Sequence, residues 1–457
     1  MKRTEQTPVY EIVIESALGK SAANWFEGFS LETTRDGHTI VRGPVVDQSA
    51  LQGLLNRLSD FGLTLTSVRR VKTRGGLVKK QKRGARVMMI VAIAVAALLI
   101  ALFGTLWLIS PGNVSHLTDE NGSVVAGSIS EKIWIPVNGS EQGLVIVGHD
   151  TTNPVLLFVH GGPGMPEYWL SKRYDPGLEE HFTVAWWDQR GAGLSFSPDI
   201  DPPTMNAEQF VADAIAVSRY LIERFGHERI YLMGHSWGSY IGIQTVAAAP
   251  ELYHAYIGIG QVTHQIESER IAYDYALAEY RRRDDERMVA KLNAAPPSNV
   301  GPLPREYERL RDAYMHGIGI GTTGEMESVI TGILLPSLRF PEYTLCEKLN
   351  LWRGKVQSRS PEYALWEPML VTDLRTAVPK LEVPAYFFHG RYDYTCAYPL
   401  ALDYYESIEA PAKGFYTFGD SAHTPVFEEP EKALSVLIDD VLNATTLGAD
   451  HALQERT

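Results

Sequence analysis

The chain has 457 residues, of which 45% are hydrophobic and 21% are charged, with 39 glycines and 26 prolines. These values are typical of a globular protein with several domains, and they exclude collagen-like, coiled-coil and disordered chains. Only two cysteines occur, Cys346 and Cys396, which excludes a disulfide scaffold, a cysteine-ligated zinc site and an iron–sulfur cluster. The net charge of −13 argues against nucleic-acid binding.

The charge is unevenly distributed along the chain. Residues 1–86 contain 15 basic and 8 acidic residues, a net +7, whereas the remaining residues contain 27 basic and 47 acidic ones, a net −20. Between the two parts, the 23 residues 87–109 carry no charge. As a helix they would extend about 34 Å, enough to cross a hydrocarbon core of roughly 30 Å. A buried core helix usually has a polar stripe, which this segment lacks. We therefore predict a single transmembrane helix at 87–109.

The charges on either side of this segment predict its orientation. The first charged residues after it are Asp119 and Glu120, whereas nine basic residues and no acidic one precede it: Arg69, Arg70, Lys72, Arg74, Lys79, Lys80, Lys82, Arg83 and Arg86. By the positive-inside rule, the N-terminus would be cytoplasmic and everything after residue 110 would lie outside the cell membrane. The 86 preceding residues argue against a secretory signal peptide.

Residues 1–71 predict a small cytoplasmic α/β domain, followed by a basic linker at 72–86. A helix at 49–61, with Asp47 as its N-cap, interrupts four expected strands at 9–15, 29–34, 39–45 and 63–71. This order suggests a ferredoxin-like sandwich, a fold that hosts many functions. No catalytic cluster occurs here, so we expect a structural or interaction module, with a ligand sensor as the alternative.

After a spacer at 110–123, residues 124–445 predict a second α/β domain, with a tail at 446–457. Two segments, 124–137 and 143–148, are expected to form an antiparallel strand pair. Short apolar strands then alternate with helices, at 155–159, 182–187, 229–233, 255–259 and 385–389. This pattern is typical of central parallel strands that are covered on both faces.

The motif GHSWG at residues 234–238 matches G-x-S-x-G and lies in the context that such a motif requires. It follows the apolar segment IYLM and precedes a helix expected at 239–249. In this strand–turn–helix arrangement the glycines permit close backbone approach and leave the Ser236 hydroxyl accessible. The backbone amide of Trp237 would then face a developing oxyanion at the helix start. The pattern predicts that Ser236 is a nucleophile.

A serine nucleophile needs a base, and the base needs an acid that orients it. In this topology they follow in the order Ser, acid, His. Asp393 and His423 both follow expected strands, at the carboxyl edge of the sheet. Asp188 precedes the nucleophile, and Asp420 lies too close to His423 along the chain. We therefore predict the triad Ser236, Asp393 and His423.

The segment HGGPG at residues 160–164 also follows an apolar strand. Its glycines would allow a backbone amide to reach the substrate oxygen and to act beside Trp237 in an oxyanion hole. We favour Gly162 for this amide, with Gly161 as the alternative. A phosphate-binding loop would end in Lys-Ser/Thr, which is absent.

The combination of HGGPG, GHSWG and the segment DQRGAGLS at 188–195 closely resembles the prolyl aminopeptidase (proline iminopeptidase) branch of the α/β-hydrolases. The resemblance extends over about residues 127–441. It implies an α/β-hydrolase fold in which Ser236, Asp393 and His423 form the triad and HGGPG contributes to the oxyanion hole. Asp188 and Arg190 would support the site rather than react.

Residues 261–379 have few strand signals, and they match the place where these hydrolases insert a helical cap. Helical stretches are expected at 267–293 and 305–315. In prolyl aminopeptidases, cap glutamates bind the free α-ammonium of the substrate, because a fixed anion can select a terminal ammonium over an internal peptide bond. Glu267 and Glu269 are the candidates best placed for this role in the sequence, and Glu325 and Glu327 follow.

Together these features predict a membrane-anchored serine hydrolase that acts outside the cell membrane. We expect an aminopeptidase that releases N-terminal Pro or small residues from peptides through an acyl-enzyme. Because the same triad serves ester bonds, a carboxylesterase or lactonase is the first alternative. A receptor whose hydrolase domain only binds a ligand is the second. The expected partners are a small peptide or ester substrate and the lipid bilayer. No metal, organic cofactor or nucleic acid is implied.

Overall fold

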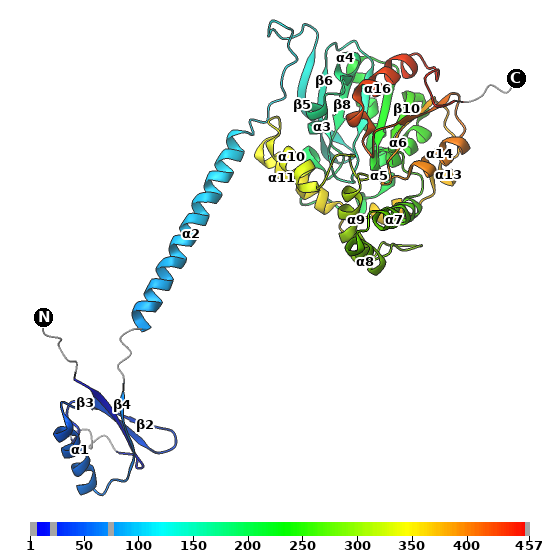
Figure 1. The fold of residues 1–457 in the computed structure, drawn as a ribbon. Coiled ribbons are helices and arrows are strands. Elements are labelled where there is room, and N and C mark those ends of the chain that lie inside the picture. Colours follow the sequence, from blue (N-terminus) through cyan, green and yellow to red (C-terminus); the bar gives the residue numbers. More distant parts are fainter. Residues whose placement is uncertain (1–6, 19–24, 72–76, 453–457) are drawn as a thin grey trace. The chain divides into compact units, whose positions relative to one another are not determined.

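The computed structural model describes residues 7–18, 25–71 and 77–452, and its two compact units are residues 1–101 and 102–457 (Figure 1). The first unit contains a four-stranded antiparallel sheet in the order β2-β3-β1-β4. Its elements are β1 (Val9–Ile14), β2 (Ser30–Thr33), β3 (Thr39–Pro44), α1 (Gln48–Asp60) and β4 (Leu65–Val71).

The small sheet and helix α1 share one apolar core. Ile12 and Val41 from the sheet are buried against Leu54 and Leu58, which lie on one face of α1. Asp47 accepts a hydrogen bond from a backbone N–H of the first turn of α1, as predicted for its N-cap. The prediction of a small sheet domain is thus confirmed. A ferredoxin-like sandwich has two helices and the described residues of this unit's globular part contain one, so that finer assignment stays a prediction.

Helix α2 (Leu77–Leu108) begins inside the segment predicted as a basic linker, whose residues 72–76 lie outside the described residues. Lysine and arginine are good helix formers, so the basic run continues the apolar helix towards the N-terminus. Within the described part of the chain, one helical segment is long and apolar enough to cross a membrane, the 21 residues Met88–Leu108, and it is not buried against other elements. Length and composition alone make this weak evidence for a membrane span.

The second unit is built on a nine-stranded sheet in the order β13-β12-β11-β10-β9-β7-β8-β6-β5. The strands β7 to β12 are parallel, and β5, β6 and β13 are antiparallel to their neighbours. The strands are β5 (Ile129–Val137), β6 (Ser140–Gly148), β7 (Val155–Val159), β8 (Thr183–Trp187), β9 (Ile230–His235), β10 (Tyr253–Ile259), β11 (Ala385–Gly390), β12 (Lys413–Phe418) and β13 (His451–Ala452). The predicted strands are confirmed, and the segment predicted as a tail adds β13.

Helices cover both faces of this sheet, because its central strands are apolar on both sides. In β7, Leu157 packs in one core cluster and Leu156 in the other. The first cluster includes residues of α5 (Ala207–Phe225), α6 (Trp237–Ala248) and α14 (Tyr398–Ser407). The second includes residues of α3 (Tyr168–Tyr174), α4 (Leu178–His181), α15 (Pro425–Glu428) and α16 (Pro430–Val436).

The insertion between β10 and β11 is helical, as predicted for a cap. It contains α7 (Gln265–Arg282), α8 (Glu286–Ala294), α9 (Arg305–Gly317), α10 (Leu335–Arg339), α11 (Leu345–Gln357), α12 (Trp366–Val371) and α13 (Leu374–Ala377). The single helix expected at 267–293 is in fact two. Asp284 has a left-handed backbone with φ 56°, and Asp285 caps α8 by accepting from the N–H of Met288. These two residues end one helix and start the next, and hydrophobic periodicity does not report such a break.

Candidate active site

Ser236 lies in the turn between β9 and α6, with a positive φ of 55° and a ψ of −120°. This turn requires glycine at 238, because a Cβ there would lie 1.8 Å from the carbonyl oxygen of Val159. Ser236 is partly exposed, whereas every other residue of 231–240 is buried. The local sequence thus presents one hydroxyl at the carboxyl edge of the sheet.

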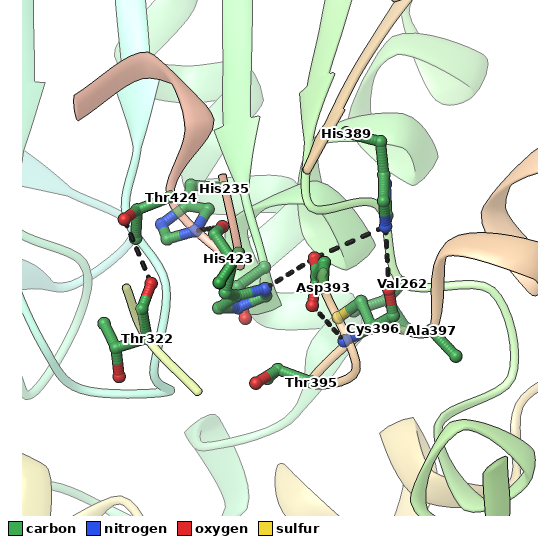
Figure 2. Close-up of polar contacts among 12 residues, drawn as sticks. His235, Val262, Thr322, His389, Asp393, Thr395, Cys396, Ala397, His423 and Thr424 are labelled. Atoms are coloured by element: carbon green, nitrogen blue, oxygen red, sulfur yellow. Dashed lines mark hydrogen bonds and ion pairs between the residues drawn. The ribbon is translucent and has the colours of Figure 1, made fainter. Parts of the chain in front are cut away.

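Asp393 and His423, which are predicted as acid and base, lie together on the loops after β11 and β12 (Figure 2). His423 Nδ1 lies 2.9 Å from Asp393 Oδ2, and the backbone N–H of Cys396 donates to Asp393 Oδ1 at 2.9 Å. Burial pushes the pKa of Asp393 up, but its contacts with His423, His389 and Cys396 outweigh this effect and lower the pKa below its ordinary value. Asp393 is therefore an ionised carboxylate that holds the His423 ring.

A cavity of about 190 Å³ brings these groups to one place. Ser236, His423, Gly162 and Trp237 all line it. Within the described residues, Ser236 and His423 make no direct hydrogen bond, and the Ser236 side chain instead lies near the Cys396 thiol and lowers its otherwise strongly raised pKa. A long nucleophile–base distance is common in unliganded hydrolases.

The remaining acidic candidates have other positions. Asp188 is buried and accepts from the N–H of Leu194, and burial raises its pKa to about 8. Asp420 is exposed. Arg190, from the same segment as Asp188, forms a buried ion pair with Asp213 at 2.8 Å. Asp188 and Arg190 thus stabilise the loop after β8.

The two predicted oxyanion donors have free backbone amides among the described contacts. The alternative donor, Gly161, donates its N–H to Glu167 Oε1 at 3.2 Å. Gly162 and Trp237 make no comparable backbone hydrogen bond. This difference favours Gly162 over Gly161 as the partner of Trp237.

Gln189 connects the HGGPG loop to Trp237 at the start of α6. Its backbone N–H donates to His160 Nε2 at 3.1 Å, and its side-chain oxygen accepts from Trp237 Nε1 at 2.9 Å. Because His160 Nε2 accepts, Nδ1 carries the proton and donates to the carbonyl oxygen of Gly161. Burial lowers the pKa of His160 to about 4, which is consistent with a neutral ring.

A second carboxylate–histidine pair was not found by sequence reasoning. His235 Nδ1 lies 2.8 Å from Glu167 Oε1, and His235 Nε2 lies 2.9 Å from the carbonyl oxygen of His423. Burial lowers the pKa of His235, but Glu167 and the His423 carbonyl outweigh burial and raise it. Since both ring nitrogens face acceptors, His235 is cationic and joins Glu167 to the backbone of His423. The signals were present, because His235 lies inside GHSWG and Glu167 lies just after HGGPG.

Glu267 and Glu269, which are predicted to bind a substrate ammonium, lie on α7 and do not belong to the cavity lining. Glu267 pairs with Arg375 at 3.0 Å. Glu269 is fully buried and accepts from Arg311 Nε and from the Tyr307 hydroxyl, each at 2.7 Å. Both carboxylates thus have partners within the protein. Among the described residues, no group of His, Cys, Asp or Glu is arranged to hold a metal ion.

Three basic residues of the cap line the cavity and were also missed: Arg311 on α9, Lys355 on α11, and Arg359 just after α11. No motif marks them, since charged residues occur throughout the cap sequence. Only the packing of α9 and α11 over the sheet edge distinguishes them from surface charges.

Comparison with known proteins identifies one matching hydrolase family and several related enzymes. Residues 154–293 match a family described as the alpha/beta hydrolase fold, and residues 9–69 match a family described as a domain of unknown function. The probable aminopeptidase YbaC of Bacillus subtilis (strain 168) is 31% identical over 298 residues, which are 65% of this chain and 91% of YbaC. A proline iminopeptidase of Heyndrickxia coagulans is 26% identical over 323 residues, 68% of this chain and 98% of that enzyme. The crystal structure of a proline iminopeptidase from Mycobacterium smegmatis overlays with a TM-score of 0.49 at 15% identity, covering 68% of this chain and 98% of that one.

Proposed function

This chain belongs to the α/β-hydrolase family, as a homologue of probable aminopeptidase YbaC and of proline iminopeptidases, and on that premise we propose that it is a serine hydrolase of peptides. We propose more specifically an aminopeptidase that releases N-terminal Pro or small residues. The observation that carries the catalytic part is the 2.9 Å contact between His423 and Asp393 beside a cavity that Ser236 also lines.

In the proposed reaction, His423 Nε2 accepts the Ser236 proton while the serine oxygen attacks the substrate carbonyl carbon. The backbone amides of Gly162 and Trp237 stabilise the resulting oxyanion. His423 then protonates the leaving amine, and water hydrolyses the acyl-enzyme with His423 again acting as base. Asp393 holds the ring in the required tautomer. Ser236 must rotate from Cys396 towards His423 for this step.

Ester hydrolysis is the second candidate, and the partners of Glu267 and Glu269 favour it. A substrate ammonium would have to displace Arg375 from Glu267, or Arg311 and Tyr307 from Glu269. An ester substrate needs no such anion. The amine-binding role of these two glutamates stays a prediction, and a carboxylesterase or lactonase stays the alternative to the peptidase.

One experiment separates these candidates from a non-catalytic receptor. The full-length chain would be labelled with a fluorophosphonate and then assayed with a proline arylamide and an acetate ester, with Ser236→Ala as the control. We expect labelling and arylamide turnover, both lost in the variant. Ester turnover alone would contradict the peptidase, and no labelling would contradict both enzymatic proposals.

We also propose that Met88–Leu108 anchors the chain in the cell membrane with the hydrolase unit outside. The support is the length and apolar surface of this segment, together with the basic residues before it and the acidic excess after it. Protease added to intact cells should remove the hydrolase unit and spare the N-terminal domain. Release of the whole chain by alkaline extraction of membranes would contradict the anchor, and the reverse protease pattern would contradict the orientation.

A further inference from the structure

The charges that line the catalytic cavity are not balanced within the protein. Four cationic side chains line it, Arg311, Lys355, Arg359 and the His235 imidazolium, against two acidic ones, Glu167 and Asp312. A cavity that must receive an ammonium alone would be expected to carry the opposite excess.

Two of these cations, Arg311 and His235, already have acidic partners. Arg311 Nε lies 2.7 Å from the fully buried Glu269. Glu167 is paired with the cationic His235 at 2.8 Å. Asp312 lies 3.8 Å from Arg311 with 62% of its side chain exposed, so water screens much of its charge.

Lys355 has no such partner. Its Nζ makes no hydrogen bond or ion pair with any residue in the described part of the chain, although the side chain is partly buried. Burial, together with the charges of Arg359 and Arg311, lowers the pKa of Lys355 to about 7, and Asp312 and Glu167 partly oppose this shift. The nearby Arg359 guanidinium lies over the Trp366 ring at 5.1 Å and likewise has no acidic partner among the described residues.

An ammonium held in a partly dry cavity without an anion is unfavourable, and a ligand anion removes that cost. A carboxylate at Lys355 would accept charge-assisted hydrogen bonds, and Arg359 and Arg311 would add attraction. The cavity is also small, about 190 Å³, whereas pockets for drug-sized ligands span roughly 300–1,000 Å³. Small size and excess positive charge together indicate a short substrate with a negative end.

We propose that Lys355 binds a free carboxylate of the substrate, so that the enzyme selects short substrates that carry one. This inference rests on the proposed serine-hydrolase function and narrows its substrate class. For the peptidase, the class is dipeptides with a free C-terminus. Longer peptides and capped peptides lack a carboxylate at the required distance from the scissile bond.

The direct test compares Pro-Ala with Pro-Ala-NH₂ on the full-length chain, since these substrates differ in the terminal carboxylate. We expect kcat/KM to favour the free acid at least about tenfold, the scale of a hydrogen bond between charged groups. Lys355→Met should bring the acid-to-amide ratio close to one, and Lys355→Arg should keep the preference. The matched control is Lys291→Met, an exposed lysine on α8, which should change neither the rates nor the ratio.

A second substrate pair keeps this proposal separable from the peptidase. If neither peptide is cleaved but fluorophosphonate labelling and acetate-ester turnover remain, the peptidase proposal is wrong. The carboxylate site is then tested by comparing monomethyl glutarate with dimethyl glutarate. Preference for the half-ester that is lost in Lys355→Met supports the carboxylate site. Equal rates for acid and neutral substrates in the parent chain, or a preference that survives in Lys355→Met, overturn it.

Discussion

Two walls enclose the cavity beside Ser236, and they hold their polar groups in different ways. On the sheet edge, which comprises Ser236, Asp393, His423 and Gly162, backbone turns and short hydrogen bonds position each group, and the charges are paired. On the cap wall, which comprises Arg311, Lys355 and Arg359, Arg311 alone has a buried counter-ion among the residues that the structure describes. Rigid, paired groups suit bond cleavage, whereas an unpaired cation suits recognition of an external anion. The difference supports our proposals that catalysis takes place at the sheet edge and that the cap wall selects the substrate.

The largest effect is expected from a substitution at the sheet edge. Asp393→Asn should lower kcat by about 10⁴-fold, because the amide no longer holds the required His423 tautomer. Hydrolysis of the best substrate measures this loss. The control is Asp420→Asn, since Asp420 is the exposed acidic residue near the same loop, and it should stay within about twofold. A comparable loss in Asp420→Asn, or a loss below tenfold in Asp393→Asn, would contradict the assignment.

The next effect concerns the stability of the cap wall. Glu269→Gln leaves Arg311 without its buried counter-ion and should lower the free energy of unfolding by about 3–5 kcal/mol. Urea or thermal unfolding of the hydrolase unit measures this change. Replacing both partners, Glu269→Leu with Arg311→Met, should recover much of the loss. The exposed Arg282→Met, which disrupts a surface pair, should cost less than about 1 kcal/mol.

A smaller effect tests whether the Glu167–His235 pair supports the sheet edge. Glu167→Gln removes the charge that keeps His235 protonated, so burial lowers the pKa of His235 and its contact with the His423 carbonyl weakens. We expect kcat to fall about 10-fold to 100-fold through misplacement of His423.

The pH profile distinguishes this positioning role from a general loss of folding. In Glu167→Gln, kcat should show an additional ionisation below neutral pH, where His235 regains its proton. Glu180→Gln, at an exposed position, should keep the parent profile. An unchanged profile with reduced kcat would assign Glu167 a merely structural role.

The smallest effect is the pH dependence of substrate preference at the cap wall. A lysine with a pKa of about 7 loses its charge as pH rises through neutrality, so the acid-to-amide preference should fall several-fold between pH 6 and pH 9. Any effect of pH on the catalytic steps at His423 changes the rates of both substrates alike and therefore cancels in their ratio. Lys355→Arg should keep a flat ratio, because guanidinium remains charged over this range. A ratio that falls equally in the arginine variant would place the responsible group elsewhere.

The same depressed pKa has a consequence for stability. Between about pH 7 and the ordinary lysine value of 10.5, the folded state binds fewer protons at Lys355 than the unfolded state. The contribution of this residue therefore makes stability rise with pH across that window. Lys355→Met should remove this part of the pH dependence, as measured by unfolding at several pH values.

The fold and the sheet-edge residues were accessible from the sequence because short segments determine their geometry. A strand, a glycine-flanked serine and a helix impose the turn at Ser236, and parallel strands bring their carboxyl ends to one edge, where Asp393 and His423 meet. The apolar run at 87–109 likewise predicts a long helix from composition alone, although its start at Leu77 depends on the helix propensity of the preceding residues.

The cap was accessible only as a helical insertion. Glu269 and Arg311 are separated by 42 positions, and no local pattern announces that they meet. A charged residue on an amphipathic helix can face solvent, pair with another charged residue or line a cavity, and the sequence pattern is the same in all three cases. Only the packing of α7, α9 and α11 over the sheet edge decided that Glu269 is neutralised within the protein and that Lys355 lines the cavity without a partner in the described part of the chain. Local backbone preferences can be read along the chain, whereas the pairing and burial of charges are properties of groups that tertiary contacts bring together.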